Sequence, residues 1–294
     1  MQKHAYLILA HNEFNLLEKL IKFLDDERND IYIHIDKKIN GFDFDKFSRL
    51  VKHSVIEFVP RVSVKWGDIS MVKAEYSLLS AALANQEYAY LHLLSGVDVP
   101  LKNLDEISAF FEKNNGVEFV NISSRNLTPT EYDRVRTYHF ASGRRNILNR
   151  AVTKAESLLS HILKIDRAKN VDIRRGSQWF SITGEFAKYL MSQKKFVMKQ
   201  FNHTLIPDEF FMQSVVVNSP FKNRVYDLKS SSRCCDPVRY TDWNRGAPYT
   251  FIIDDYDELI GCGCLFARKF SSVTDCEIID KLYERLNENG EELF

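Results

Sequence analysis

The chain has 294 residues, in which 40 basic side chains balance 40 acidic ones and 45% of the residues are hydrophobic. This length allows one large core, and the composition is typical of a folded protein. Because the charges cancel, no global field gathers nucleic acid or an anionic membrane; we expect no nucleic-acid partner.

The first residues predict a buried strand rather than a targeting segment. The apolar run at 5–10 is too short for the hydrophobic part of a secretory signal, and no small-residue cleavage site follows it. No window approaches the roughly twenty apolar residues that cross a bilayer. We therefore expect a cytoplasmic location. The five cysteines lack the spacing of a disulfide framework or a zinc site, which predicts reduced thiols.

Up to about residue 122, short apolar runs alternate with segments of helical period. Strands are expected at 5–10, 31–35, 54–59, 88–94 and 118–121. Helices are expected near 12–25, 44–52, 70–85 and 103–113, the last opened by Asn103 with Glu106 at capping-box spacing. This alternation predicts an α/β fold with a mostly parallel, Rossmann-like sheet flanked by helices, and residues 1–122 are interpreted as its nucleotide-binding half.

Candidate binding residues lie at the ends of three of the predicted strands. Ala10 and His11 follow the first strand, Asp36 the second, and Ser95 and Asp98 the fourth. In open sheets the ligand lies beyond the carboxyl ends of the strands, so Ala10, His11, Asp36 and Ser95 are candidate nucleotide-binding residues. Considered singly, each of these residues could instead have a structural role, in capping a loop.

The common phosphate-binding loops are absent from the sequence. No Gly-x-Gly-x-x-Gly follows the first strand and no Gly-x-x-x-x-Gly-Lys-Ser/Thr occurs, which disfavours dinucleotide dehydrogenases and P-loop NTPases. Asp-x-Asp occurs at 43–45 and 255–257, each beside a predicted helix start, where the helix dipole favours carboxylates. We therefore expect no metal site.

Residues 141–175 form a basic segment, with nine basic side chains, three acidic ones and a local charge of +6. Its apolar residues recur at spacings of three and four, which predicts an amphipathic helix containing Leu148, Val152, Ala155, Leu159, Ile162 and Ile165. Two interpretations stay open: a helix packed on the domain with a solvated polar face, or a surface for peripheral contact with anionic lipid or a lipid-diphosphate acceptor.

After residue 176 the predicted elements are a strand at 177–182, a helix opened by Thr183, a helix at 208–217, a strand ending at Tyr240, and short helices at 255–261 and 276–287. No linker rich in proline, glycine or serine separates them. One continuous domain over 1–294 is therefore expected, with 123–294 as its acceptor-binding and catalytic half.

An ordered set of motifs spans most of the chain. They are HIDKK at 34–38, WG at 66–67 with VKAE at 72–75, HLLSGVDVPLK at 92–102, GSQWF at 176–180, PDEFF at 207–211, RYTDW at 239–243 and LFARKF at 265–270. This set resembles glycosyltransferase family 14, the core-2/I-branching β-1,6-N-acetylglucosaminyltransferase family, which also contains peptide O-xylosyltransferases and bacterial members.

The resemblance implies a GT-A-like nucleotide-sugar-binding fold and an inverting transferase that uses a UDP-sugar without a metal or other cofactor. By motif position, Glu209 corresponds to the catalytic base, and Arg239 and Lys269 to the cations that hold the donor diphosphate. Arg268 would point elsewhere if its run is extended. The alternatives are a helix-start role for Glu209, and salt bridges from the cations to Asp242 or the carboxylates at 254–257.

For the acceptor sugar, Asp98, Arg134 and Trp179 are the candidate contacts, with core packing as the competing account of Trp179. The expected partners are a UDP-sugar donor and a glycan or lipid-linked glycan acceptor. N-acetylglucosamine is the favoured sugar, while UDP-xylose or another UDP-sugar stays open. Two further hypotheses are a non-catalytic glycan- or nucleotide-binding module and a metal-dependent transferase that uses Asp98 or an Asp-x-Asp pair.

Overall fold

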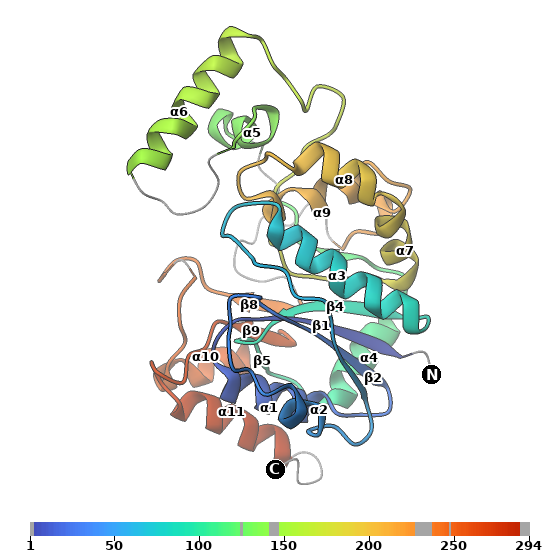
Figure 1. Ribbon diagram of the computed structural model, residues 1–294. Helices are drawn as coiled ribbons and strands as arrows, with labels where there is room; N and C mark the ends of the chain where they lie inside the picture. The colour runs from blue at the N-terminus through green and yellow to red at the C-terminus, as the bar shows by residue number, and fades with distance from the viewer. Residues whose placement is uncertain (1–2, 124–125, 141–146, 227–236, 247, 289–294) are drawn as a thin grey trace.

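The computed structural model describes residues 3–123, 126–140, 147–226, 237–246 and 248–288, arranged as Figure 1 shows. Its centre is a six-stranded sheet in the order β3-β2-β1-β4-β7-β6. The strands are β1 (His4–Ala10), β2 (Asn29–Ile35), β3 (Val55–Phe58), β4 (Tyr90–Ser95), β6 (Phe119–Val120) and β7 (Phe180–Thr183). Strands β1 to β4 pair in parallel, whereas β7 is antiparallel to both neighbours. The predicted α/β fold with a mostly parallel sheet is confirmed.

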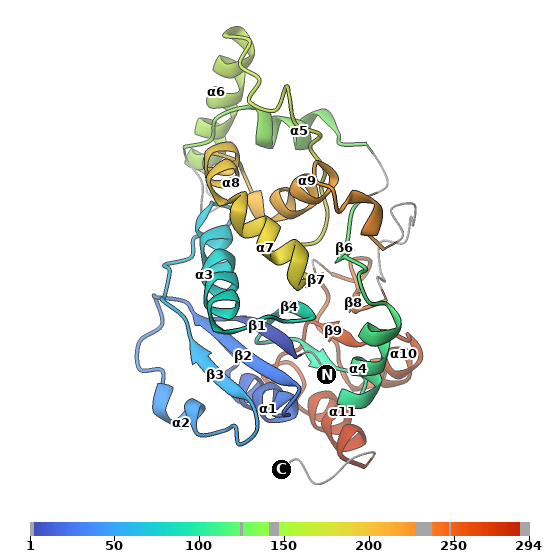
Figure 2. The same ribbon diagram turned by 90° about the vertical axis from the view of Figure 1, so that its right-hand side faces the viewer.

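The helices cover both faces of this sheet (Figure 2). They are α1 (Phe14–Leu24), α2 (Phe44–Ser48), α3 (Ser70–Asn85), α4 (Leu104–Lys113), α5 (Pro129–Arg136), α6 (Ile147–Ile162), α7 (Gly184–Ser192), α8 (Lys194–Phe201), α9 (Phe211–Val217), α10 (Tyr256–Gly261) and α11 (Glu277–Glu288). Alternate β1 side chains point to opposite faces. Leu7 and Leu9 enter the core shared with α3, α7, α8 and α9, whereas Tyr6 and Ile8 enter the core shared with α1, α4 and α11.

A second, three-stranded sheet brings the C-terminal motifs to the carboxyl end of β4. Its order is β5 (Val99–Pro100), β9 (Phe266–Arg268) and β8 (Arg239–Thr241). Strand β9 pairs antiparallel with β5 and parallel with β8. Because β5 follows β4 after a short turn, β8 and β9 are drawn to the edge of the main sheet where its parallel strands end. The N–H of Phe270 donates to the carbonyl of Val97 in that turn, at 3.1 Å.

Most predicted elements agree with the observed ones, although several boundaries differ; the strand predicted at 177–182, for example, begins at Phe180. The helix at 70–85 is observed over the same residues, and the capping box of Asn103 and Glu106 is present. The helix predicted at 44–52 ends at Ser48. The helix predicted at 208–217 is broken: a 3₁₀ turn, η1 (Pro207–Glu209), ends at Phe210, whose φ of −127° is not helical, and α9 begins at the next residue.

Helix α5 is not among the predicted elements, although its start carries a clear signal. The side chain of Thr128 accepts the N–H of Glu131, the Glu131 carboxylate accepts the N–H of Thr128, and Pro129 occupies the first helical position. The predicted amphipathic helix is observed as α6, but it ends at Ile162, so Ile165 lies beyond it. Arg144 and Arg145 of the basic segment lie outside the described residues, as do the side chains at 147–150.

In the described part of the chain, Cys262, Cys264 and Cys276 are free thiols, as predicted. Cys234 and Cys235 lie outside it. A search of the described helices finds none with the length and apolar character that a bilayer crossing requires.

Candidate active site

The predicted nucleotide-binding residues gather where β1, β2 and β4 end. The N–H of Asp36 donates to the carbonyl of Ala10 at 3.0 Å, and the N–H that follows Ser95 donates to the carbonyl of Leu9 at 3.0 Å. Ala10 and Ser95 are buried, Asp36 is half-buried and His11 is exposed. The fold thus brings these residues to one edge of the sheet, and their contact with a nucleotide stays a prediction.

Asp98 is buried in the turn after β4. Its carboxylate accepts the N–H of Ser95 at 3.1 Å and the Ser95 hydroxyl at 2.5 Å, and the Arg268 Nε lies 3.4 Å away. Burial raises the pKa of the Asp98 carboxyl, and the positive charge of Arg268 opposes this. These contacts use Asp98 to hold the turn and the guanidinium, and its contact with an acceptor sugar is untested.

Arg268 joins two of the predicted site residues, which the sequence did not indicate. Besides facing Asp98, its guanidinium lies 4.2 Å from the centre of the Trp179 ring. Such a cation–π contact is strengthened by burial, and both side chains are mostly buried. Arg268, the neighbour of Lys269, therefore also lies among the predicted site residues.

Arg239 extends from β8 beneath the main sheet. Its Nη2 donates to the carbonyl of Leu93 at 3.1 Å, to the carbonyl of Phe180 at 2.6 Å and to the hydroxyl of Ser181 at 3.1 Å. The guanidinium thus lies in the interior between β4 and β7, and the residue is 5% exposed.

Two of the carboxylates suggested as alternative partners of Arg239 and Lys269, those of Asp242 and Asp255, are held by another arginine. Arg245 forms ion pairs with Asp242, with Asp255 at 2.5 Å and with Glu258 at 2.8 Å. For Asp242 and Asp255, the salt-bridge alternative is therefore disfavoured.

Lys269 lies directly after β9 and beside the turn that ends β4. Its N–H donates to the carbonyl of Tyr249 at 3.4 Å, and its carbonyl accepts the N–H of Phe251 at 3.1 Å. The residue is half-buried. Within the described residues, no hydrogen bond or ion pair is found for its ammonium group, and its contact with the donor diphosphate stays a prediction.

Glu209 ends the η1 turn, and the local backbone fixes its position. Ile206 before the turn has φ of 59°, in the left-handed region, and its N–H donates to the carbonyl of Gly67 at 2.9 Å. The carbonyl of Glu209 accepts the N–H of Gly176 at 2.9 Å. A Cβ at Gly176 would lie 1.8 Å from the carbonyl oxygen of Asn121, so this close approach requires glycine.

Two arginines lie on one oxygen of the Glu209 carboxylate. The Arg175 Nε donates to Oε2 at 2.8 Å, and the Arg134 Nη1 lies 3.7 Å from the same atom. The other end of the Arg175 guanidinium donates to Glu131 at 2.6 Å. The Glu209 side chain is 26% exposed, and Oε1 has no hydrogen bond to a described residue. One oxygen is thus fixed and the other is left for a proton.

Two further carboxyl groups, those of Asp208 and Glu75, lie near this part of the site. Burial raises the pKa of Asp208 to about 7, and the negative charge of Glu209 adds to the shift. Glu75 is completely buried and accepts the amide of Gln178 at 2.8 Å; burial raises its pKa well above the ordinary value, and the nearby charge of Asp208 adds to this. The predicted candidate residues do not include these groups.

The loop at 175–179 connects the two sides of the site. It carries Arg175 and Gly176, which contact Glu209, and it carries Trp179, which lies against Arg268. None of these contacts joins Glu209 directly to Arg239 or Lys269.

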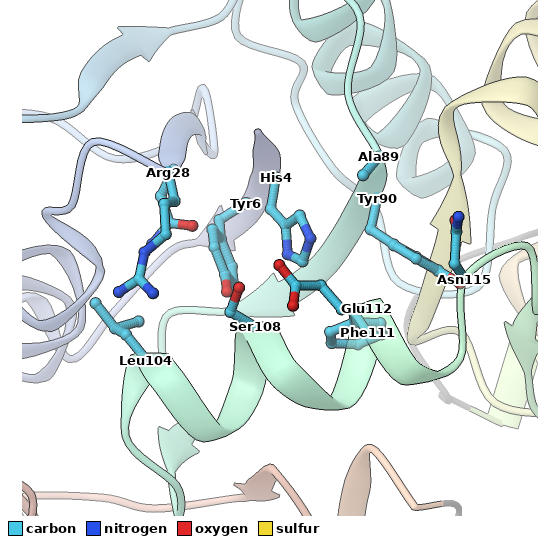
Figure 3. Close-up of a pocket in the computed structure, with 11 residues that line it drawn as sticks. His4, Tyr6, Arg28, Ala89, Tyr90, Leu104, Ser108, Phe111, Glu112 and Asn115 are labelled. Carbon is cyan, nitrogen blue, oxygen red and sulfur yellow. The ribbon is translucent and has the colours of Figure 1, made fainter. Parts of the chain in front are cut away.

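A cavity of about 200 Å³ opens beside Arg175. Its lining residues come from the segment after β6, from α5 and from the loop before β7: Ser123, Asn126, Leu127, Tyr132, Ile173, Arg174 and Arg175. A second cavity of about 250 Å³ lies at the opposite, amino end of β1 and β4, where His4, Tyr90 and Glu112 line it (Figure 3). Ligands of open α/β sheets bind at the carboxyl ends of the strands, which disfavours the second cavity as the nucleotide site.

The carboxylates of both Asp-x-Asp pairs have local roles. Asp43 caps α2 by accepting the N–H of Lys46 at 2.9 Å, and Asp255 accepts the N–H of Ile252 at 2.9 Å besides pairing with Arg245. Over the described residues, no group of three or more His, Cys, Asp or Glu side chains is placed to hold a metal ion. Whether the reaction needs a metal is untested.

Three comparisons relate this chain to known proteins. The model of the "Branch: Core-2/I-Branching enzyme" family matches residues 4–259. Xylosyltransferase 2 of Canis lupus familiaris is 24% identical over 95% of this chain and 33% of that protein, and xylosyltransferase 1 of Homo sapiens is 24% identical over 95% and 30%. The chain therefore spans about a third of the length of these relatives.

Among solved structures, core-mannan synthase A of Aspergillus fumigatus, in an Mn/GDP form, aligns with 77% of this chain and 72% of that one, at a TM-score of 0.39 and 12% identity. The family model covers most of the chain, including the segments that carry the strand-end residues, Glu209 and Arg239. The chain therefore belongs to the core-2/I-branching enzyme family, glycosyltransferase family 14, as its motifs predicted.

Proposed function

We propose that the chain is an inverting, metal-independent glycosyltransferase that moves N-acetylglucosamine from a UDP donor to a glycan hydroxyl with β linkage. The arrangement of Glu209 carries this proposal: Arg175 holds Oε2, while Oε1 is left for the proton of the acceptor. A general base must be within hydrogen-bond reach of the proton that it takes. The cavity beside Arg175, the arginine that holds Oε2, is the proposed space for the acceptor.

In the proposed reaction, the acceptor oxygen forms a bond to the anomeric carbon while the bond from that carbon to the diphosphate breaks. The proton passes to Glu209, and the electron pair leaves with UDP. Lys269 and, by motif position, Arg239 offset the charge of the departing diphosphate; for this the guanidinium of Arg239 must turn away from the carbonyls of Leu93 and Phe180. Charge-assisted hydrogen bonds of this kind are worth roughly 1.5–3 kcal/mol each. The position of Lys269 directly after β9 supports its part, because no described residue forms a hydrogen bond or ion pair with its ammonium group.

Xylose is the second candidate donor sugar. The relatives reported above are named xylosyltransferases, and nothing in the described site separates a pentose from an N-acetylhexosamine. A thermal-shift comparison of UDP-N-acetylglucosamine with UDP-xylose, each with and without chelator, tests the donor and the metal together. Stabilisation by neither compound, or stabilisation that chelator removes, contradicts the corresponding part of the proposal.

The substitution Glu209→Gln tests the base. Donor binding is expected to persist while UDP release in the presence of a panel of glycan acceptors falls roughly 10²- to 10⁴-fold. Glu87→Gln is the matched control, because Glu87 is an exposed carboxylate that pairs with Lys188. Near-normal turnover of Glu209→Gln would assign the base to another residue.

A further inference from the structure

Helix α6 is amphipathic, yet it turns its apolar side away from the protein. From residue 151 onward, where its side chains are described, the large apolar side chains of α6 and the one that follows are exposed: Val152 37%, Leu158 64%, Leu159 56%, Ile162 68% and Leu163 59%. Ala151 and Ala155 on the same stripe are exposed too. At 3.6 residues per turn these seven residues occupy one continuous face of the helix. An ordinary surface helix buries such a stripe against the core.

The polar side of α6 makes the contacts with the protein instead. Ser160 is buried, and its carbonyl accepts the N–H of Ile165 at 2.9 Å. The Glu156 carboxylate accepts the N–H of Phe140 at 3.0 Å and lies 3.8 Å from the ring of His139. These contacts determine the rotation of the helix about its axis, so the outward direction of the apolar face is built into the fold.

The charges around this face are basic. Lys154 lies four residues before Leu158 and therefore on the same side of the helix, and Lys164 follows Leu163; both are exposed. Glu156 is the acidic residue of α6, and it points toward the protein. The outward surface thus combines an apolar stripe with positive charge, which complements an anionic surface.

The position of α6 allows its outward face to lie on an extended surface. In Figures 1 and 2 it projects at one end of the molecule, with α5 beside it and the main sheet at a distance. We propose that the outward face of α6 binds the surface of a bilayer that contains anionic lipid. An interfacial helix of this type buries its apolar side at the headgroup boundary while its basic side chains meet the lipid phosphates.

A second copy of the chain fits this face less well. A symmetric contact places the same patch of both copies together, so Lys154 and Lys164 of one copy would approach those of the other. No acidic side chain on the outward face of α6 would neutralise them. Among these two occupants, the charge favours the bilayer.

Co-sedimentation with vesicles tests the proposal. The full chain is expected to sediment with vesicles of phosphatidylglycerol and phosphatidylcholine in equal parts, and much less with phosphatidylcholine alone. The double variant Leu158→Asp/Ile162→Asp should bind at least about tenfold more weakly, and Lys154→Gln and Lys164→Gln roughly fivefold more weakly each. The control Val273→Asp replaces an apolar side chain that is 90% exposed elsewhere, and it should bind like the wild type.

Several results would overturn this assignment. They are absence of wild-type binding to the anionic vesicles, equal binding to neutral ones, or unchanged binding of the double variant. Sedimentation equilibrium provides another: a dimer that the double variant converts to a monomer would assign the face to a second copy. Because vesicle binding uses neither donor nor acceptor, its failure leaves the proposed transfer reaction untouched, and the converse also holds.

Discussion

Asp208 provides a stability measurement that reports on the surroundings of Glu209. Burial raises the pKa of its carboxyl from the ordinary value of 3.8 to about 7. A carboxyl with a higher pKa in the folded protein contributes stability at low pH, and this contribution is lost as the pH rises through the folded pKa. The substitution Asp208→Asn removes the ionisation while keeping the shape of the side chain.

The size of the effect follows from the shift. Each pKa unit corresponds to about 1.36 kcal/mol, so between about pH 5 and pH 8 the wild type should lose roughly 2–3 kcal/mol of unfolding free energy through Asp208. Asp208→Asn lacks this loss, and its unfolding free energy relative to the wild type should rise by that amount. Glu118, whose pKa burial also raises to about 7, titrates in both proteins and cancels in the comparison.

Urea unfolding followed by tryptophan fluorescence at pH 5, 6.5 and 8 measures this difference. Asp257→Asn is the control because Asp257 is exposed, and its difference from the wild type should stay constant over the same range. If the difference for Asp208→Asn is equally constant, Asp208 is already ionised in the folded protein at pH 5, and a pKa of about 7 for its carboxyl is wrong.

Three further substitutions examine the site. Gly176→Ala places a Cβ 1.8 Å from the Asn121 carbonyl oxygen, so it should lower the unfolding free energy by about 1–3 kcal/mol in urea titrations, and unchanged stability would refute the close approach. Arg268→Ala leaves Asp98 buried without its cation and should lower the unfolding free energy by roughly 3–5 kcal/mol. In an Asp98→Asn background the same substitution should lower it much less. Equal losses of unfolding free energy in the two backgrounds would mean that the pair does not interact. Lys269→Ala should weaken UDP binding about 10- to 100-fold in calorimetry with chelator present, and recovery on addition of magnesium would indicate a metal site instead.

The sheet could be predicted because its strands are nearly pure apolar runs separated by helical periods. All seven β1 residues are buried, and the helix at 70–85 is observed without a shift at either end. Side chains after parallel strands meet at one edge whatever their identity, so Ala10 and Asp36 could be placed together without coordinates. The break at Phe210 could not be predicted. Adjacent apolar residues such as Phe210 and Phe211 are equally compatible with one continuous helix and with a turn followed by a helix.

The parts of the site that sequence missed are contacts between distant segments. Arg175 reaches Glu209 across 34 positions, and Arg268 reaches Asp98 across 170. An arginine in a basic run gives no sign of its partner. The raised pKa of Asp208 was hidden for a related reason: burial depends on what the whole chain packs around a residue, and the neighbours Pro207 and Glu209 do not reveal it.

The direction of α6 shows the limit of periodicity most clearly. Spacings of three and four establish a helix with an apolar stripe, but they do not say whether that stripe faces the protein. Here the polar contacts decide: Glu156 is held at Phe140 and His139, and His161 contacts Arg136 of α5. Helix α5 also carries Arg134, which lies on Glu209. A surface bound by the outward face of α6 would therefore be connected to the candidate base through a single helix, α5.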